Sequence, residues 1–310
     1  MSDTGRTGDN LFGIVVPFYS RHGYFLELIE SLLKQSDGRF EVLIIDDSGK
    51  NLIGKDFLTK SCDDRFSLIA NSSNFGPFVS WNIGLSEMFS RQRYRILSIV
   101  HEDDLLNRDY VKNSLEAVEK HPSIDVFHSR VKIIGSYGKP KITVQDLIKG
   151  LANLGSKQLE IQSAHDNGLA RILSNNFVFC PTMVFNASKF ESIEFGSRWK
   201  MVGDLDFIAN ALLSGRTFLQ LPDKNYFYRR HENNLTVKLT STTTRFQEEL
   251  QIYNELEEVC KTAGFNASAK VAGNARIIKL HIAYRIVISL VRFDLSGLRQ
   301  LISVYPFKKN

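Results

Sequence analysis

The chain has 310 residues, of which 43% are hydrophobic and 24% are charged, and its formal net charge is +5. This length allows one large domain or two ordinary ones, and the composition excludes a disordered chain, a low-complexity fibre and a collagen-like repeat. The excess of basic residues indicates acidic partners without saying which.

Cysteine usage and apolar runs indicate the cellular compartment. Cys62, Cys180 and Cys260 lie far apart and form no C-x-x-C pair, so a reducing cytosol is expected rather than a disulfide framework. The polar stretch 1–10 and the apolar run 11–16, which lacks a cleavage site, do not resemble a signal peptide. Since no apolar run reaches 18 residues, we expect no membrane-spanning helix. The sequence therefore predicts a cytoplasmic protein.

Strand-like and helix-like segments alternate in the first half of the chain. Apolar, β-branched runs predict strands, and apolar residues spaced three and four apart predict helices. In chain order we expect strand 11–16, helix 24–34, strand 40–45, strand 66–70, helix 79–91, strand 94–100, helix 110–120 and strand 124–134. This alternation predicts an α/β fold of Rossmann-like type, in which helices cover both faces of a mostly parallel sheet.

The second half of the chain is less regular. Residues 135–165 are mixed and polar, and they predict either a loop inserted over a site or a variable surface excursion. Beyond them we expect a strand at 177–185 broken by Pro181, a helix at 204–214, a short strand at 217–221 and only helices from Thr244 onward. A Thr/Ser-rich run near 238–244 marks the expected boundary between a domain at 1–240 and a helical extension at 241–310.

Polar clusters follow three of the predicted strands, at 17–21, 46–49 and 101–104. In an open parallel sheet, ligands bind in the crevice beyond the carboxyl ends of the strands. Carboxylates gathered at 101–104 would hold Mg²⁺ or Mn²⁺ on a diphosphate, or would form a solvated turn or helix cap. Asp46 and Asp47 would accept hydrogen bonds from a ribose or a base, or would form a plain turn.

Six short motifs follow one another in a distinctive order. They read Val-Val-Pro17-Phe-Tyr19-Ser-Arg21, Ile-Ile-Asp46-Asp47-Ser48, Asn74-Phe-Gly76 with Asn82-Ile-Gly84, His101-Glu-Asp103-Asp104, Gly203-Asp204-Leu-Asp206-Phe207 and Tyr228-Arg-Arg-His231. In this order and at these spacings they resemble the family 2 glycosyltransferases of the GT-A fold. The resemblance covers residues 11–236 and rests on the combination, because each motif alone is weak.

The resemblance implies that the first three motifs form a nucleotide pocket. The residues it assigns to that pocket are Pro17, Tyr19, Asp46, Asp47, Asn74 and Asn82. Asp46 would hydrogen-bond the base, and the two asparagines would lie around the nucleotide and the sugar.

The later motifs resemble those that bind the metal and catalyse transfer in this family. By that resemblance, Asp103 would bind Mg²⁺ or Mn²⁺ and the diphosphate, and His231 would contact the diphosphate or complete the metal shell. Asp204 would be the catalytic base. Arg229 would add positive charge beside the leaving diphosphate.

Two positions depart from the family pattern. His101 replaces the first Asp of the D-x-D motif, so it either hydrogen-bonds a ligand hydroxyl in the cofactor site or packs without a ligand role. Gly203 replaces the Glu that normally precedes Asp204, which leaves the orientation of this carboxylate open and makes Asp206 a substitute base. Trp199 would stack on an acceptor sugar or pack in the core.

The resemblance implies an inverting glycosyltransferase. It would move a sugar from a nucleotide diphosphate sugar to a glycan or lipid-linked saccharide, in bacterial surface polysaccharide synthesis. One alternative is a catalytically silent subunit that binds a nucleotide sugar or a glycan. Another is a nucleotidyltransferase, which normally has a glycine-rich phosphate loop after its first strand. Nucleic acid is not an expected partner.

The last helices combine aliphatic and basic residues. Within 271–304, Arg285, Arg292 and Arg299 recur every seven residues and therefore form one stripe along a helix. Such helices would dock peripherally on an anionic membrane, here the inner face of the cytoplasmic membrane. The alternative is that they pack on the catalytic domain or on a second copy of the chain.

Overall fold

The computed structural model describes residues 10–20, 22–140, 165–175 and 177–305, so most of the expected loop at 135–165 lies outside the described residues. The chain forms two compact units. The first comprises Met1–Gln162, Val178–Phe195 and Arg216–Arg230, and the second comprises Ser163–Phe177, Gly196–Gly215 and His231–Asn310. The compact units do not divide at residue 240, and a domain boundary there stays a prediction.

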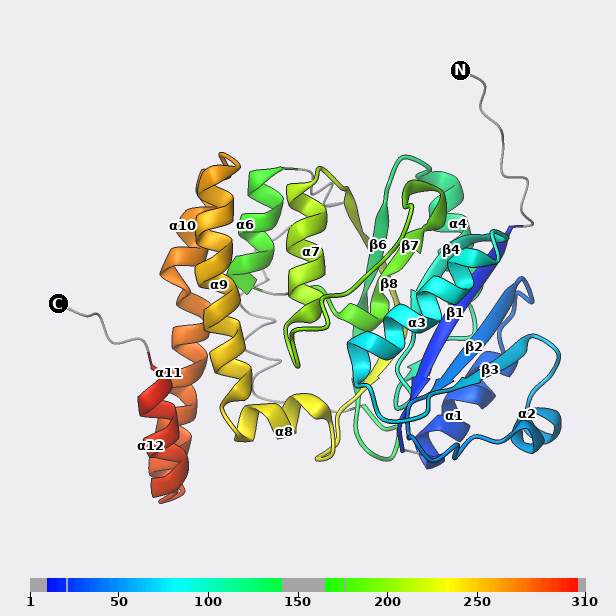
Figure 1. Cartoon of the computed structure of the whole chain (residues 1–310), viewed down its shortest axis with the longest axis horizontal. Helices are drawn as coiled ribbons and strands as arrows, with labels where there is room; N and C mark the ends of the chain where they lie inside the picture. The colour runs from blue at the N-terminus through cyan, green and yellow to red at the C-terminus, as the bar shows by residue number, and fades with distance from the viewer. Residues whose placement is uncertain (1–9, 21, 141–164, 176, 306–310) are drawn as a thin grey trace. The chain divides into compact units, whose positions relative to one another are not determined.

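A mixed sheet forms the centre of the first unit (Figure 1). Its strands are β1 (Leu11–Phe18), β2 (Phe40–Asp46), β3 (Phe66–Ala70), β4 (Tyr94–Ile99), β5 (Leu105–Leu106), β6 (Val126–Ile134), β7 (Val184–Asn186) and β8 (Phe218–Arg229). They lie in the order β3-β2-β1-β4-β7-β6-β8-β5. Strands β1 to β4 run parallel, and β7 is antiparallel to both β4 and β6. Because β6 is parallel to β8, the carboxyl end of β8 lies at the same edge as those of β1 and β4.

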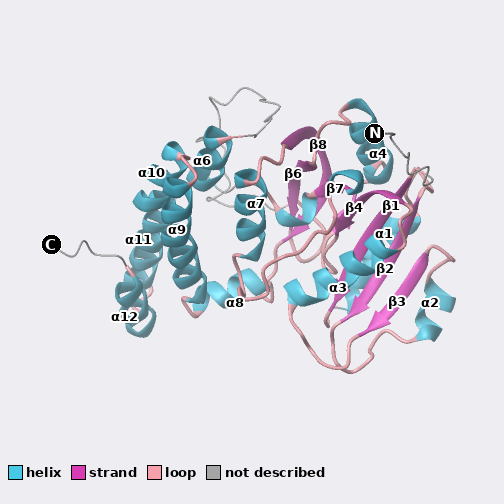
Figure 2. Ribbon diagram, turned by 45° about the horizontal axis from the view of Figure 1, so that its top comes forward, coloured by secondary structure: helices cyan, strands magenta, loops and turns pink. Residues whose placement is uncertain are grey.

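Helices cover both faces of this sheet, as the alternating pattern predicted (Figure 2). The first-unit helices are α1 (His22–Leu33), α2 (Lys55–Ser61), α3 (Pro77–Ser90) and α4 (Tyr110–Lys120). On β1, Ile14 and Val16 belong to a core that includes buried residues of α1 and α4. Val15 faces the other way and meets Gly84 of α3. Since neighbouring strand residues point to opposite faces, β1 is buried on both sides.

Two predicted strands differ from the structure. The strand expected at 177–185 is a 3-10 turn at Cys180–Thr182 followed by the three-residue β7, because Pro181 has no N–H to give to a neighbouring strand. The strand expected at 217–221 continues to Arg229 as β8. Its second half pairs with β5 and with the end of β6 beyond a register shift, and this pairing outweighs the turn-forming residues at 222–225.

The second unit is helical. It contains α6 (Asp166–Asn175), α7 (Gly203–Leu213), α8 (Leu235–Ser241), α9 (Thr244–Thr262), α10 (Asn266–Asn274), α11 (Arg276–Val291) and α12 (Leu295–Val304). The Tyr253 hydroxyl of α9 donates to the carbonyl of Leu173 in α6 at 2.5 Å. The carboxylate of Asp166 accepts from the N–H groups of Ala267 and Ser268 and so caps α10. Among the described residues, no helix is long and apolar enough to cross a bilayer.

Close packing of α3 on β1 generates a stability prediction. A Cβ at Gly84 would lie 2.3 Å from Cγ1 of buried Val15, so Gly84→Ala should lower the free energy of unfolding by about 1–3 kcal/mol. Gly23→Ala in α1 is the matched control, since a Cβ there meets nothing within 4 Å and should stabilise the helix slightly. Urea unfolding monitored by circular dichroism measures both. Equal stability of the two variants would contradict the close approach.

Candidate active site

The acidic turn after β4 gathers three groups that can bind a cation. Ligand atoms of His101, Asp103 and Asp104 all lie within 4.8 Å of one another. Both aspartates are buried, and the histidine is half-buried. Carboxylate oxygens, which both aspartates offer, are the ligands that Mg²⁺ and Mn²⁺ prefer. The residues present therefore fit a divalent cation.

The carboxylate of Asp104 is hydrogen-bonded to β8. Its two oxygens accept hydrogen bonds from the Tyr226 hydroxyl at 2.8 Å and from the backbone N–H of Arg229 at 2.7 Å. Burial, and next the neighbouring Asp103 carboxylate, hold the pKa of Asp104 well above its ordinary value. With Asp104 held in this way, Asp103 is the stronger candidate for a first metal ligand.

Arg229 is fully buried and holds the acidic turn from the β8 side. Its Nε donates to the carbonyl of Asp103 at 2.7 Å, and its two terminal nitrogens donate to the carbonyl of Ser136 and to the carboxylate of Glu27. The guanidinium also lies 4.4 Å from the centre of the Tyr24 ring. The protein itself engages each guanidinium nitrogen, and a contribution of Arg229 to neutralising a diphosphate stays a prediction.

Glu102 joins the acidic turn to the loop after β1. Its Oε2 accepts from the N–H groups of Tyr19 at 2.9 Å and Ser20 at 3.3 Å, and its side chain is buried. Tyr19 itself is 52% exposed at the carboxyl end of β1, just beyond Pro17. Sequence reasoning missed this role of Glu102, although its place inside the acidic motif was a signal.

Asp46 shapes the loop that follows β2. Its two carboxylate oxygens accept from the backbone N–H of Ser48 at 2.9 Å and of Ile53 at 2.8 Å, and the side chain is fully buried. The structure thus shows the turn-forming role that the sequence left open. A hydrogen bond from Asp46 to a base stays a prediction.

Asp47 brings the loops after β2 and β3 together. Its carboxylate accepts from the side chain of Asn71 at 2.8 Å and from the backbone N–H groups of Phe75 and Gly76 at 2.9 and 3.0 Å. The Asn74 amide donates to the carbonyl of Asp47 at 3.0 Å. The predicted residues Asp47 and Asn74 therefore lie side by side, and they order the loop that leads into α3.

Asn82 holds the backbone of Phe195, whose ring belongs to an aromatic cluster that contacts His101 of the acidic turn. Its amide exchanges two 2.8 Å hydrogen bonds with the backbone of Phe195. Phe195 contacts Trp81 edge-on, with ring centres 5.2 Å apart, and Trp81 stacks on His101 at 5.5 Å. His101 therefore packs against an aromatic ring, which was one of its two expected roles. Contact of Asn82 or His101 with a nucleotide sugar stays a prediction.

Asp204 lies in the first turn of α7, in the second unit. It is half-buried and accepts from the backbone N–H of Leu205 at 2.8 Å. Burial raises the pKa of Asp204 to about 6, which suits a base that acts near neutral pH.

Asp206 has a different environment, although it lies on the same helical turn. Its carboxylate accepts from the Asn210 amide at 3.2 Å and lies 3.9 Å from the guanidinium of Arg198. Arg198 in turn lies 4.2 Å from the ring centre of Trp199, which is buried. Trp199 is therefore buried and covered by Arg198, which agrees with the core-packing alternative.

His231 also belongs to the second unit. It is buried, and its backbone N–H donates to the Asn234 side chain at 2.6 Å. Its contact with a diphosphate or a metal, and the cooperation of Asp204 with Asp103, stay predictions.

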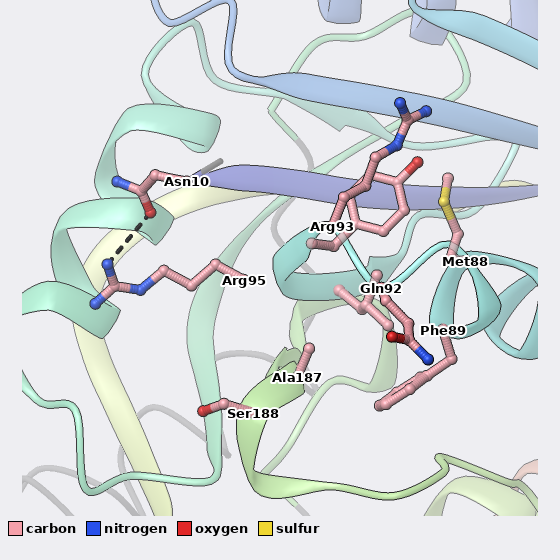
Figure 3. Close-up of a pocket in the computed structure, with 10 residues that line it drawn as sticks. Asn10, Met88, Phe89, Gln92, Arg93, Arg95, Ala187 and Ser188 are labelled. Atoms are coloured by element: carbon pink, nitrogen blue, oxygen red, sulfur yellow. Dashed lines mark hydrogen bonds between the residues drawn. The ribbon is translucent and has the colours of Figure 1, made fainter. Parts of the chain in front are cut away.

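A separate pocket of about 280 Å³ lies at the amino ends of β1 and β4, opposite the acidic turn (Figure 3). Arg95 reaches from its wall toward Asn10, with a hydrogen bond of 3.4 Å. Because open parallel sheets bind nucleotides beyond the carboxyl ends of their strands, this pocket is not the expected donor site.

The fold and the acidic turn together define a GT-A type of glycosyltransferase fold. The chain belongs to glycosyl transferase family 2, whose family model matches residues 13–184.

Several curated proteins and solved structures are similar to the chain. It is 23% identical over 223 residues to the poly(ribitol-phosphate) β-N-acetylglucosaminyltransferase TarS of Staphylococcus aureus, covering 70% of this chain and 35% of that protein. It is 20% identical to the glycosyltransferase GlyG of Streptococcus pneumoniae over 83% of each chain. The chain matches about a fifth to a third of the length of the first curated relatives.

Two solved structures share the fold at lower identity. The crystal structure of TarS residues 1–349 with UDP-GlcNAc has a TM-score of 0.66 at 19% identity, over 95% of this chain and 79% of that one. The mannosyltransferase PcManGT of Pyrobaculum calidifontis with GDP-Man and Mn²⁺ has a TM-score of 0.52 at 12% identity, over 98% and 89% of the two chains.

The buried contacts of Arg229 generate a prediction. Arg229→Lys keeps the charge but cannot reach all three acceptors, so the free energy of unfolding should fall by about 2–4 kcal/mol. Arg130→Lys is the matched control, because Arg130 lies exposed on the neighbouring strand β6. Chemical denaturation measures both variants. An unchanged stability of Arg229→Lys would show that these hydrogen bonds do not hold the turn.

Proposed function

We propose that this chain is an inverting glycosyltransferase that moves a sugar from a nucleoside diphosphate sugar to a hydroxyl of a saccharide acceptor. The observation that carries the proposal is the buried group of His101, Asp103 and Asp104 at the carboxyl edge of the sheet, in a chain whose family model matches residues 13–184. Similar structures contain UDP-GlcNAc in one case and GDP-Man with Mn²⁺ in another, which supports a nucleotide-sugar donor.

The donor would bind beyond the ends of β1, β2 and β4. Tyr19 is exposed there, and Glu102 fixes the backbone that carries it. Asp103, with His101 and Asp104 beside it, would hold Mg²⁺ or Mn²⁺, and His231 would complete the shell. When bound, such an ion neutralises charge on the leaving diphosphate. The protein's part is to hold these groups in place before the donor arrives.

Asp204 would accept the proton of the acceptor hydroxyl as that hydroxyl attacks the anomeric carbon. The new carbon–oxygen bond forms as the bond to the diphosphate breaks, so the configuration inverts and no covalent sugar–enzyme intermediate arises. A pKa near 6 keeps the carboxylate ionised at neutral pH and still leaves it basic enough to take the proton.

The acceptor we propose is a glycan or a lipid-linked saccharide of a bacterial surface polysaccharide. The similarity to TarS and to the minor teichoic acid biosynthesis protein GgaA of Bacillus subtilis, 23% identical over 72% of this chain and 48% of that protein, supports this class. We also propose that the enzyme acts in the cytoplasm. The three cysteines, all free thiols, agree with a reducing compartment.

Donor binding tests the metal site. Asp103→Asn should abolish the rise in melting temperature that UDP-sugars or GDP-sugars produce with Mn²⁺, because a ligand stabilises only the state that binds it. Asp56→Asn, a change of an exposed carboxylate on α2, should leave the shift intact. If Asp103→Asn responds to donor and Mn²⁺ as the unmodified protein does, Asp103 does not hold the metal.

Transfer kinetics test the base. Asp204→Asn should bind donor normally and lower the transfer rate by roughly 10²–10⁴-fold, while Asp206→Asn should change it far less. Since protonation removes the base, the unmodified rate should fall about tenfold per pH unit below a pKa near 6. An inactive Asp206→Asn and an active Asp204→Asn would instead assign the base to Asp206.

Release of nucleoside diphosphate in the absence of acceptor separates an enzyme from a binding subunit. An active transferase transfers slowly to water, so donor hydrolysis should depend on Mn²⁺ and on Asp204. Tight donor binding without any hydrolysis or transfer would support a catalytically silent subunit.

A further inference from the structure

The net positive charge of the chain is concentrated in its last 45 residues. Residues 266–310 have eight lysines and arginines and one acidic residue, so they carry +7, while the other 265 residues together carry −2. Five of these basic residues lie in or next to α11 and α12: Arg276, Lys279, Arg285, Arg292 and Arg299. Such segregation of charge marks a surface that attracts anions.

No described carboxylate pairs with these five side chains, whereas α9 contains the ion pair of Arg245 with Glu249 at 2.8 Å. The one acidic residue of the region, Asp294, accepts from the N–H of Gly297 at 2.9 Å and so caps its own helix. Arg276, Arg292 and Arg299 are exposed, while Lys279 and Arg285 are half-buried. No carboxylate in the described part of the chain neutralises this charge.

The same helices expose an apolar stripe. Leu280, Tyr284, Val287 and Val291 are 55%, 43%, 55% and 70% exposed, and their spacing of four, three and four residues places them on one face of α11. The buried residues Ile278 and Ile282 lie on the inner side of the helix. Four neighbouring apolar side chains in water are unusual for a surface without a binding role.

The turn between α11 and α12, which pack side by side (Figure 1), extends this apolar surface. Phe293 is 89% exposed and Leu295 is 68% exposed. Phe293 also has a φ of 55°, a left-handed conformation that a bulky side chain rarely adopts. An exposed aromatic ring on a backbone conformation that is costly for its residue type is a candidate for contact with a partner outside the folded chain.

We propose that the outer surface of α11 and α12, from Arg276 to Ile302, docks on an anionic phospholipid bilayer. The apolar stripe and Phe293 would enter the boundary between headgroups and acyl chains, and the arginines would contact lipid phosphates. A second copy of the chain fits less well, because a symmetric contact would bring Arg292 and Arg299 of one copy toward the same basic surface of the other. The proposal does not depend on the proposed function, since lipid binding needs no donor.

Co-sedimentation of the full chain with vesicles tests the charge. Binding to vesicles of phosphatidylglycerol and phosphatidylcholine should exceed binding to pure phosphatidylcholine and should weaken at high salt. The double variant Arg292→Gln/Arg299→Gln should bind about 25-fold more weakly, about five-fold for each charge removed. Lys60→Gln/Arg108→Gln, which removes two exposed charges from the first unit, is the matched control and should bind normally.

A second variant tests the apolar contact without a penalty to folding. Phe293→Gly removes the ring and suits the left-handed backbone, so its melting temperature should equal or exceed that of the unmodified protein. Its vesicle binding should nevertheless fall by about tenfold or more.

Three results would overturn the proposal. One is equal binding by the arginine variant and its control. Another is binding that ignores lipid charge and salt. The third is absence of vesicle binding together with a concentration-dependent dimer in sedimentation velocity, which would assign the surface to a second copy. Vesicle co-sedimentation and sedimentation velocity use neither donor nor acceptor. Their outcomes therefore test the docking surface independently of the proposed function.

Discussion

A fully buried arginine and a fully buried aspartate hold the end of β8 to the turn that follows β4. Arg229 gives its backbone N–H to Asp104 and its Nε–H to the carbonyl of Asp103. Removing charged groups from water is costly unless each is paired and hydrogen-bonded, so this network leaves the turn little freedom. Glu102 then extends it to the backbone after β1. Three segments far apart in the sequence thus meet at one edge of the sheet.

This arrangement determines the electrostatics of the candidate site. Burial of the acidic turn and repulsion from the Asp103 carboxylate both favour the protonated form of the Asp104 carboxyl group. The pKa of Asp104 is therefore raised. A divalent cation bound at this turn would relieve both effects, because it would bring a large positive charge to the carboxylates. Holding the carboxylates in place beforehand avoids reorganisation when charge develops on a leaving group. The hydrogen bonds that shape the fold and the groups available to a ligand are therefore parts of one network.

The sequence predicted most of the sheet and the helices on its faces, because hydrophobic period and turn residues are local signals. Helix α4 has the predicted bounds. The break predicted at Pro181 is present, but residues 177–179 before it form no strand, and β8 continues past the predicted end at residue 221. Local signals mislead at these two places. Pro181 interrupts an apolar run and replaces a strand by a 3-10 turn, and the polar half of β8 is held by pairing with β5 and β6 rather than by its own composition.

The sequence by itself determined the family and the residue types of the site, because the order of the motifs is a property of the chain. Tertiary structure decided which of those residues form hydrogen bonds within the protein. Asn82 binds the backbone of Phe195, 113 residues away, and Arg229 binds Glu27, 202 residues away. The two aspartates of α7 also differ only after folding. Burial raises the pKa of Asp204, whereas Asp206 has Asn210 and Arg198 as polar partners. Hydrogen-bond partners and burial depend on atoms that are distant in sequence, and no local pattern records them.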